Sequence, residues 1–443
     1  MVNVTSPLSL ADSAWLHMER PNNLMTICGL LTFDQLPDHQ RLLALLQHRL
    51  CAHLRFRSRV VESPLSLPHW EELPHFDLND HLIIEELSDP GPECLMDRVS
   101  ELMSQPLDRS RPLWEFRLFP GAHTGVPGEH AAMLVRLHHA IGDGISLMRV
   151  LLNLADLRPD EPWPAPLQAP KPTAPLWERA RRMTERWLHR GHDALFHPAQ
   201  LLEVGKSLAR VLALPPDRQH PLKGEVGEEK RATTSIPLDL EEVKQKSKRL
   251  GCTVNDVLMG ALAGALGRTL ARRMEVPEDM ELRAVVPVDL RGGDCSELSN
   301  RFGMVFLRLP VGCTDPAQRL VQTRANMAEL KNSPEALVTY EVLSAVGATP
   351  REFEAVVIDW FGNKASAVVT NLPGPRQPLY LGKARIESVM YWVPQSGHLG
   401  LGISFLSYAG RIRLGIASDV GLLPDPEELQ RDFLECYQEF ESI

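Results

Sequence analysis

The residues best suited to chemistry are two adjacent histidines and a nearby aspartate. The segment 138–144 reads HHAIGDG and contains His138, His139 and Asp143. It follows an apolar run at 131–137 that predicts a buried strand, and it precedes a stretch at 145–152 with helical apolar spacing. A junction of this kind holds side chains rigidly beside a cavity. Because imidazole accepts a proton near neutral pH, the pattern indicates a general base.

Two other interpretations of this segment remain open from its residues alone. A His-His-Asp set also occurs in half of a metal site, or at a polar strand end followed by a Gly-Asp-Gly turn. The sequence has no HExxH motif, no CxxC motif and no second histidine cluster to complete a metal site. We therefore expect neither a metal nor a bound cofactor.

Composition and charge limit the class of protein. The chain has 443 residues and a net charge of −10, a length that suits two domains. An isoelectric point near 5.9 argues against a nucleic-acid partner. We find no apolar run of about 18–20 residues that would span a bilayer and no signal peptide. Seven scattered cysteines favour a reducing, cytoplasmic location.

Further short motifs are spread over nearly the whole chain. They are SPLS at 6–9, ERPNN at 19–23, PLWE at 112–115, NDV at 255–257, VPVDLR at 286–291, NRFG at 300–303 and TNLPGP at 370–375. With HHxxxDG, their order resembles the bacterial wax ester synthase/diacylglycerol acyltransferase family of the chloramphenicol acetyltransferase-like (CAT-like) superfamily. Pro112-Leu113-Trp114 resembles the PLW motif of that family, and Asn255-Asp256 resembles its ND motif.

The resemblance implies an α/β fold with two CAT-like domains. Their mixed sheets are flanked by helices, and the active-site tunnel lies at the domain interface. The implied activity transfers a long-chain acyl group from acyl-CoA, as co-substrate, to a fatty alcohol or diacylglycerol, which gives wax ester or triacylglycerol. The implied attack is direct. The sequence agrees, because it has no GxSxG element and no cysteine beside the histidine motif.

Two rival functions fit the same fold. One is a condensation domain or acyltransferase that takes its donor from a carrier protein. A free-standing chain without a carrier-domain serine motif disfavours it. The other is a catalytically silent lipid-binding protein, which the intact His-His-Asp set disfavours.

The roles within the motif follow from the chemistry and from the resemblance. We expect His139 to be the general base and His138 to pack beside it or orient it. Asp143 is expected to turn away and fix the loop through an arginine. The candidates for that arginine are Arg55, Arg57, Arg59 and Arg291. Gly142 and Gly144 are expected to permit a tight turn and leave room for substrate.

The other candidate site residues each have a structural alternative. Thr370, Asn371 and Asn255 are candidate oxyanion donors. However, 370–375 also reads as a strand end with a Pro-Gly turn, and Thr253 with Asp256 as a helix cap beside Asn255. Pro112, Leu113 and Trp114 would line the acyl channel or join a core. Lys244 and Lys248 would hold the phosphates of coenzyme A or lie on a solvated helix face.

The predicted organisation has three parts. Residues 1–155 form the first CAT-like domain, 156–225 a proline-rich crossover linker, and 226–443 the second CAT-like domain. Within the linker, 176–190 reads as a basic, Trp-bearing amphipathic helix. That helix would bind the inner membrane or lipid inclusions as a peripheral anchor, or would pack on the protein or on another copy. The oligomeric state stays open.

Individual elements are also predicted. Strands are expected at 25–33 and 131–137, helices at 38–50, 93–104, 240–250, from 254 onward and at 424–440, and a hairpin at 399–417.

Overall fold

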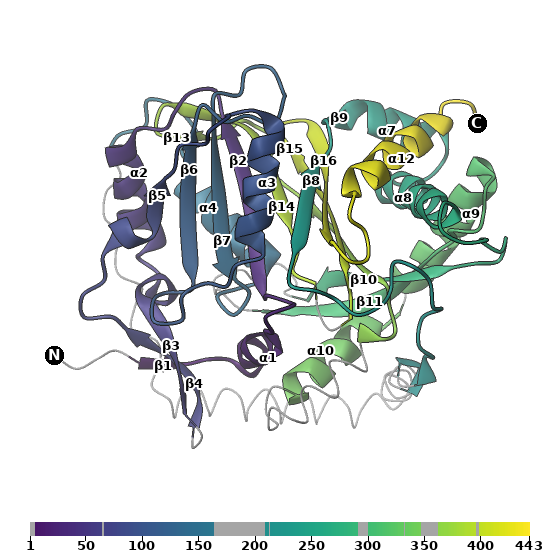
Figure 1. Ribbon diagram of the computed structural model, residues 1–443, viewed down its shortest axis with the longest axis horizontal. Helices are drawn as coiled ribbons and strands as arrows, with labels where there is room; N and C mark the ends of the chain where they lie inside the picture. The colour runs from purple at the N-terminus through teal and green to yellow at the C-terminus, as the bar shows by residue number, and fades with distance from the viewer. Residues whose placement is uncertain are drawn as a thin grey trace, which may run out of the picture.

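Two large sheets lie side by side in the computed structural model (Figure 1). The structure describes residues 5–63, 66–163, 209–211, 213–290, 300–331, 333–346, 362–395 and 398–443. Two predictions from the sequence lie outside this part of the chain: the amphipathic helix at 176–190 and Arg291 as a partner of Asp143.

The first sheet carries the histidine motif at the end of one of its central strands. Its order is β13 (Tyr380–Leu381), β14 (Ala384–Trp392), β2 (Thr26–Phe33), β7 (Ala131–His138), β6 (Trp114–Pro120) and β5 (Leu82–Ile84). Neighbouring strands are antiparallel except for the β5–β6 pair. The strands predicted at 25–33 and 131–137 are confirmed.

Helices cover both faces of this sheet. Successive side chains of a strand point to opposite faces, and in β2 both sets are apolar. Ile27 and Leu31 of β2 face a core that also holds α2 (His39–Leu45), its π-helical continuation η1 (Leu46–Leu50) and α4 (Gly144–Leu154). Leu30 faces the opposite core, with α3 (Pro92–Met103). The helices predicted at 38–50 and 93–104 are therefore confirmed within a residue or two.

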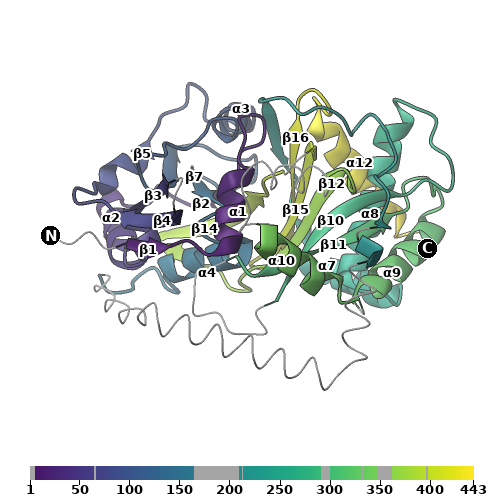
Figure 2. The same ribbon diagram turned by 90° about the horizontal axis from the view of Figure 1, so that it is seen from below.

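A small third sheet includes the strand that directly precedes the helix carrying Asp12 and Trp15. It has the order β1 (Thr5–Pro7), β4 (Ser66–Glu72) and β3 (Ser58–Ser63). The chain passes directly from β1 into α1 (Leu10–Met18), which lies between the two large sheets in Figure 2. Two short 3-10 turns complete this region, η2 (Leu54–Arg57) and η3 (Leu78–Asp80).

The second sheet is mixed, as the resemblance implied. Its order is β11 (Phe302–Leu309), β10 (Leu282–Asp289), β12 (Ala367–Pro373), β15 (Leu401–Tyr408), β16 (Arg411–Asp419) and β8 (Lys230–Thr234), with β9 (Leu238–Asp239) beside β16. The β10–β12 and β12–β15 pairs are parallel. The predicted hairpin is confirmed, and its turn places Ala409 and Gly410 at φ 47° and 81°.

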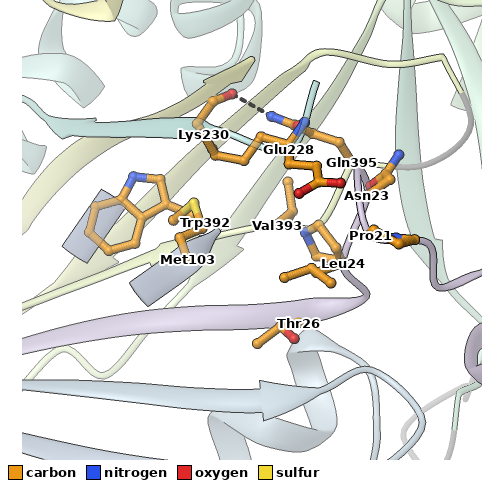
Figure 3. A pocket seen from close by; sticks show the side chains of 12 residues that line it. Pro21, Asn23, Leu24, Thr26, Met103, Glu228, Lys230, Trp392, Val393 and Gln395 are labelled. Atoms are coloured by element: carbon orange, nitrogen blue, oxygen red, sulfur yellow. Dashed lines mark hydrogen bonds between the residues drawn. The ribbon is translucent and has the colours of Figure 1, made fainter. Parts of the chain in front are cut away.

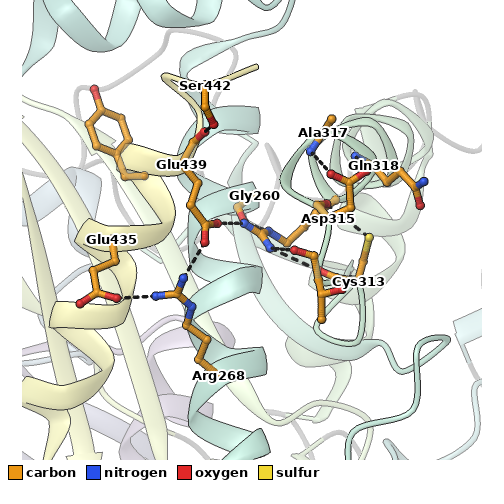
Figure 4. Close-up of polar contacts among 12 residues, drawn as sticks. Gly260, Arg268, Cys313, Asp315, Ala317, Gln318, Glu435, Glu439 and Ser442 are labelled. Carbon is orange, nitrogen blue, oxygen red and sulfur yellow. Dashed lines mark hydrogen bonds and ion pairs between the residues drawn. The ribbon is translucent and has the colours of Figure 1, made fainter.

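The described helices of the second half pack on or beside this sheet, and the one at 335–346 lies next to α1 (Figure 2). They are α7 (Leu240–Arg249), α8 (Val254–Ala271), α9 (Pro316–Lys331), α10 (Glu335–Val346) and α12 (Pro426–Glu439). Thr253 and Asp256 form the predicted capping box at the start of α8. Buried Arg319 on α9 donates to the Gly260 carbonyl of α8 and pairs with Glu439 of α12 at 2.7 Å, which ties three helices together (Figure 4).

The two sheets do not divide the chain as simply as the predicted boundary at residue 226. Strands β13 and β14 come from the C-terminal part of the chain, yet they pair with the first sheet through β14 and β2. The chain therefore returns to the first half after β12. A boundary based on composition misses this return, because neither strand differs in composition from its neighbours.

No single helix in the described ranges is both long and apolar enough to cross a membrane. Together, α7 and α8 meet the length and composition test, but their axes are bent by 91° and α8 is almost entirely buried in the second core.

Candidate active site

The HHxxxDG segment forms the predicted junction between a strand and a helix. β7 ends at His138, and α4 begins at Gly144. Asp143 is the N-cap of α4, since its Oδ1 accepts from the Ser146 amide at 2.9 Å. Its Oδ2 accepts from the amide of Arg301 at 3.1 Å. The carboxylate thus fixes both the start of α4 and the segment that leads into β11.

His139 is enclosed by aromatic rings and held by its backbone. Its ring stacks on Trp15 at 4.0 Å between centroids, with Phe302 at 5.8 Å. Its amide donates to the Met25 carbonyl at 2.7 Å, and its carbonyl accepts from the Asn300 amide group at 2.8 Å. Nδ1 is buried and has no hydrogen-bond partner among the described residues.

This surrounding keeps the His139 imidazole neutral. Burial lowers the pKa of His139 to about 4, although the nearby Asp143 carboxylate opposes that shift. A neutral imidazole has a free lone pair at physiological pH. It is therefore ready to accept a proton without first losing one.

His138 supports the turn rather than facing the same space. Its Nδ1 accepts from the Ala140 amide at 3.0 Å, so the ring proton belongs on Nε2, which lies 3.0 Å from Glu19 Oε2. Burial raises the pKa of Glu19, but hydrogen bonds from His138 and Arg109 outweigh it and lower that pKa to about 2. Glu19 therefore stays ionised and holds the His138 tautomer.

Three of the four arginines that were candidates for pairing with Asp143 lie in the described part of the chain, and each has other partners. Arg55 donates to the carbonyls of Ala140 and Ile141 at 3.2 and 2.7 Å, and it pairs with Asp12 at 3.0 Å. It thus fixes the histidine loop through the backbone. Arg57 and Arg59 pair with Glu72 and Glu71 in the small sheet, which removes both as the predicted partner.

An apolar pocket begins beside the start of α4. It has a volume of about 420 Å³. Its lining comes from β2, β7, α4, β12 and β14: Ile27, Gly29, Leu31, Val135, Leu137, Gly144, Leu147, Met148, Leu151, Leu372, Val389, Met390 and Tyr391. The pocket therefore lies between the two sheets and next to the histidine motif.

A second pocket extends the first along α4. It has a volume of about 330 Å³, shares Leu31, Met148, Leu151 and Val389 with the first, and reaches Leu379. We call the two together the apolar passage. At 1.5 Å per residue, the stretch of α4 from Gly144 to Leu152 covers about 12 Å. Such a passage suits an alkyl chain.

Gly144 lies at the wall of the apolar passage with an ordinary backbone conformation. Neither Gly142 nor Gly144 has a positive φ, so the tight-turn explanation does not hold for them. A Cβ on Gly144 would lie 3.4 Å from Leu372 Cδ1, at the wall of the apolar passage. A side chain at this position would therefore contact the wall of the passage next to the motif.

One polar pair borders the first pocket. Among the described lining residues, Tyr391 carries the only polar side chain, and its hydroxyl lies 3.0 Å from Thr370 Oγ1. Both groups are buried. Thr370, predicted from the sequence as an oxyanion donor, is thus hydrogen-bonded to Tyr391 at the wall of the first pocket.

Asn255 and Asn371 are brought together by the fold. Asn371 Nδ2 donates to Asn255 Oδ1 at 2.6 Å, which connects the start of α8 to β12. Asn255 is exposed. This hydrogen bond joins a helix end to a strand. It therefore supports a structural role for Asn255 and Asn371, which is the alternative to their role as oxyanion donors.

The PLW residues belong to the first core rather than to the apolar passage. Trp114 is buried, donates to the Phe56 carbonyl at 2.9 Å and stacks on His81 at 4.4 Å. Leu113 is also buried, and its carbonyl accepts from the His138 amide at 3.0 Å. The core alternative therefore accounts for Leu113 and Trp114, and Pro112, Leu113 and Trp114 are not among the described residues that line the apolar passage. Large apolar side chains at a central strand pack into the core, where they support the motif from behind.

The basic residues of α7 that were candidates for phosphate binding lie on its exposed side. Lys244 and Lys248 are exposed, and Lys244 pairs with Glu241 at 3.3 Å on its own helix. In Figure 1, α7 lies beside α8 and α12. The solvated-face alternative accounts for this run of charge.

A third pocket, of about 390 Å³, opens where β2 begins (Figure 3). Thr26, Asn23, Lys230 and Gln395 give it a more polar lining than the apolar passage has. Thr26 faces His138 across the β2–β7 pair, and its hydroxyl is buried without a hydrogen-bond partner in the described ranges. This pocket therefore approaches the histidine motif from the opposite side.

A buried serine, histidine and aspartate in the second half do not form a nucleophilic triad. His220 Nδ1 accepts from the Leu222 amide, so Nε2 carries the proton that points to Ser366 Oγ at 2.7 Å. Ser366 in turn donates to Asp217 at 2.6 Å. No lone pair of the imidazole faces the hydroxyl, which is the reverse of a base and its nucleophile.

Several residues around His139 were missed by sequence reasoning. Trp15 and Asp12 lie three apart on α1, a spacing that places both on one face. Asn300 and Phe302 lie in a motif that indicated only the family. Tyr391 had no signal at all. Trp15 and Asp12 could have been found from the sequence, because an aspartate lies inside a mostly apolar helical stretch directly after the SPLS motif.

A mixed α/β fold of two sheets, with an HHxxxDG loop at their junction, defines the class of CAT-like acyltransferases and condensation domains. Within that class, the family model described as "Wax ester synthase/diacylglycerol acyltransferase catalytic domain" matches residues 8–258, and "WS/DGAT C-terminal domain" matches residues 298–441. The chain belongs to the wax ester synthase/diacylglycerol acyltransferase family of O-acyltransferases.

Similar proteins span nearly the same length. A Mycobacterium tuberculosis protein named as a diacylglycerol O-acyltransferase is 29% identical over 97% of this chain and 90% of its own length. The O-acyltransferase WSD of Acinetobacter baylyi is 27% identical over 99% of this chain and 97% of its own.

Solved structures support the same fold. The wax ester synthase/diacylglycerol acyltransferase from Marinobacter aquaeolei matches with a TM-score of 0.71, 24% identity and 99% of both chains covered. The first condensation domain of the calcium-dependent antibiotic synthetase matches with a TM-score of 0.64 and 16% identity, over 98% of this chain and 95% of that one.

Proposed function

We propose that this enzyme transfers a long-chain acyl group from acyl-CoA to the hydroxyl of a fatty alcohol or diacylglycerol, by direct attack with His139 as general base. The products are a wax ester and a triacylglycerol. The observation that carries the proposal is a neutral, buried imidazole at the junction of the two sheets, in a motif whose Gly144 lines an apolar passage.

In the proposed reaction, His139 accepts the proton of the incoming hydroxyl as its oxygen attacks the thioester carbonyl. A carbon–oxygen bond forms, and a tetrahedral oxyanion results. The carbon–sulfur bond then breaks, and the His139 imidazolium returns the proton to the leaving thiolate, which gives free coenzyme A. General-base catalysis of this kind contributes about 10²–10⁴-fold. No bound cofactor is required by these steps.

The oxyanion needs hydrogen-bond donors that are already in place. The Tyr391 and Thr370 hydroxyls are our candidates, because they form a buried polar pair at the wall of the first pocket. Loss of one such donor costs about 2.7–4 kcal/mol in the transition state.

The substrates also suggest where the enzyme works. Long-chain donors and acceptors partition into lipid, so we propose that the protein acts from the cytoplasm as a peripheral protein on the inner membrane or on lipid inclusions. The predicted amphipathic helix at 176–190 is the candidate contact.

The test is thiol release from palmitoyl-CoA in the presence of hexadecanol or a diacylglycerol. We expect His139→Ala to lose about 100-fold or more in kcat and Tyr391→Phe to lose less, with the far-UV circular dichroism of both unchanged. Thiol release by His139→Ala at the wild-type rate would contradict the role of the base. A folded wild-type protein that releases no thiol with either acceptor, but acts on a carrier-protein thioester, would instead favour the condensation-type function.

A further inference from the structure

We propose that Asn300 is a positioning residue that holds His139 in its reactive orientation, through a buried cluster that it forms with Asp12 and Arg55. This inference rests on the proposed role of His139 as base. It assigns the support of that base to residues from three distant segments of the chain.

The contacts of Asn300 settle the orientation of its amide. One terminal atom lies 2.8 Å from Asp12 Oδ1 and 2.8 Å from the His139 carbonyl oxygen. Both partners are acceptors, so this atom must be the NH₂ group. The Asn300 backbone amide also donates to Asp12 Oδ1, at 3.3 Å. All three residues are buried, which makes each of these bonds costly to lose.

Asp12 is the centre of the cluster. It has no exposed surface, and its second oxygen accepts from Arg55 at 3.0 Å. Arg55 continues to the carbonyls of Ala140 and Ile141, the two residues after His139. The three carbonyls of residues 139–141 are therefore all held by the cluster, one by Asn300 and two by Arg55.

The start of α1 places Asp12 for this task. Ser9 caps the helix by accepting from the Asp12 amide at 3.0 Å, and Trp15 lies one turn further along the same face. Trp15 stacks on the His139 ring. One helix thus supplies both the wall against the ring and the carboxylate that anchors Asn300.

The segment before β11 completes the arrangement with three consecutive residues. Asn300 binds the His139 carbonyl, the Arg301 amide binds Asp143, and the Phe302 ring lies 5.8 Å from the His139 ring. Each residue touches a different part of the histidine motif. A shift of this segment would move the imidazole relative to the apolar passage.

The free face of Asn300 also points to a role at the imidazole. Its Oδ1 and the Nδ1 of His139 are both buried, and neither has a hydrogen-bond partner within the described ranges. Burial, Asp143 and His138 have the larger effects on the pKa of His139, and the Asn300 side chain raises that pKa. Removing the side chain should therefore lower the pKa further.

The test compares variants in the thiol-release assay, with each substrate varied separately. We expect Asn300→Ala to lose about 100-fold in kcat, as for a catalytic group misplaced by about 1 Å. The KM for each substrate should stay within about threefold, because the binding surfaces are untouched. The acid limb of kcat/KM should stay at or below pH 4.

A structural role predicts different readings. A merely loosened site would admit water, and the acid limb would move upward toward the ordinary histidine value of about 6.5. A rise in KM for both substrates together with that upward shift would overturn the positioning role. So would a wild-type kcat in a folded Asn300→Ala protein.

Asp12 provides the conservative rescue. Asp12→Asn keeps one oxygen that accepts from Asn300, whereas the oxygen that accepts from Arg55 becomes an NH₂ group, so kcat should fall less than in Asp12→Ala. Asp12→Ala removes the acceptor and should match Asn300→Ala in kcat. Equal kcat losses in the two Asp12 variants, measured on folded protein, would refute the chain of contacts.

Two matched controls lie in the second half. Asp217 is a buried aspartate that pairs with Arg283 at 3.2 Å, and Asp217→Ala should lower the unfolding midpoint without lowering kcat. Asn326 donates to the Arg308 carbonyl at 2.9 Å, and Asn326→Ala should leave kcat unchanged. An equal kcat loss in Asp217→Ala would overturn the proposal, because the loss of any buried ion pair would then be enough to lower kcat.

The two levels of inference fail separately. A fully active His139→Ala protein would remove the proposed function and this inference together. An inactive His139→Ala protein beside a fully active, folded Asn300→Ala protein would remove only the positioning role.

Discussion

Leu151→Trp should make the enzyme selective for short chains. Leu151 lines both pockets of the apolar passage and lies seven residues along α4 from Gly144. At 1.5 Å per residue, this is about 10 Å from the start of the helix. An indole at this position would fill the second pocket. It would leave the part beside Gly144 open.

The size of the effect follows from the methylenes that lose their burial. Each buried methylene contributes about 0.8 kcal/mol, or about fourfold in kcat/KM. If about six methylenes of a long chain extend beyond Leu151, their loss would cost up to about 5 kcal/mol. A short chain that ends before Leu151 should lose almost nothing. The ratio of kcat/KM between long and short chains should therefore fall by about 10²–10³-fold.

The assay also identifies which substrate occupies the passage. Palmitoyl-CoA is compared with hexanoyl-CoA at a fixed acceptor, and hexadecanol with hexanol at a fixed donor. If the variant is selective only between the two acyl-CoA donors, the passage binds the acyl chain. If it is selective only between the two alcohols, the passage binds the acceptor. Leu434→Trp is the control, since Leu434 is half-buried on α12 against the other core. Equal losses for long and short chains in both comparisons would refute the assignment of the passage.

Two further predictions concern pH and the lipid surface. Burial lowers the pKa of His139 to about 4, so its imidazole stays neutral at pH 5. We therefore expect kcat/KM to be constant from pH 7 to 5 and to fall only near pH 4. A midpoint near pH 6.5 in this profile would contradict the role of His139 as a buried base. In the same range stability declines, because the unfolded chain binds a proton at His139 near pH 6.5 and the folded protein does not, so circular dichroism must confirm folding at each pH. The full chain should sediment with vesicles that contain anionic phospholipid and diacylglycerol, and a variant with Trp177→Ser and Trp187→Ser should do so less; a wild-type protein that stays in the supernatant would refute the lipid-surface role.

The parts of the site that were predictable are those encoded locally. The apolar run into β7, the Gly-Asp-Gly sequence and the helical spacing after it determine where His139 lies. The capping box of Thr253 and Asp256 is local as well. In each case the interacting residues lie within a few positions of each other, so their spacing predicts the contact.

The support of the base was not predictable in this way. Asn300 is 161 residues from His139 and 288 from Asp12 along the chain. No periodicity relates such positions, and their contacts exist only once both sheets are packed. The same holds for Tyr391, which reaches the apolar passage because β14 returns to the first sheet. Conversely, Trp114 and Lys244 have side chains suited to binding an acyl chain and a phosphate. In the structure Trp114 lies in the first core and Lys244 lies on a solvated helix face.

The position of the site between two sheets has a physical consequence for catalysis. The first half supplies His139 together with Trp15, whereas the second half supplies Phe302 and Asn300. Since burial is the largest influence on the pKa of His139, both halves must be packed before the imidazole reaches its neutral, enclosed state. The same packing closes the apolar passage, because Leu372 and Tyr391 form its wall opposite α4. Packing of the two sheets therefore determines both the neutral state of His139 and the wall of the apolar passage.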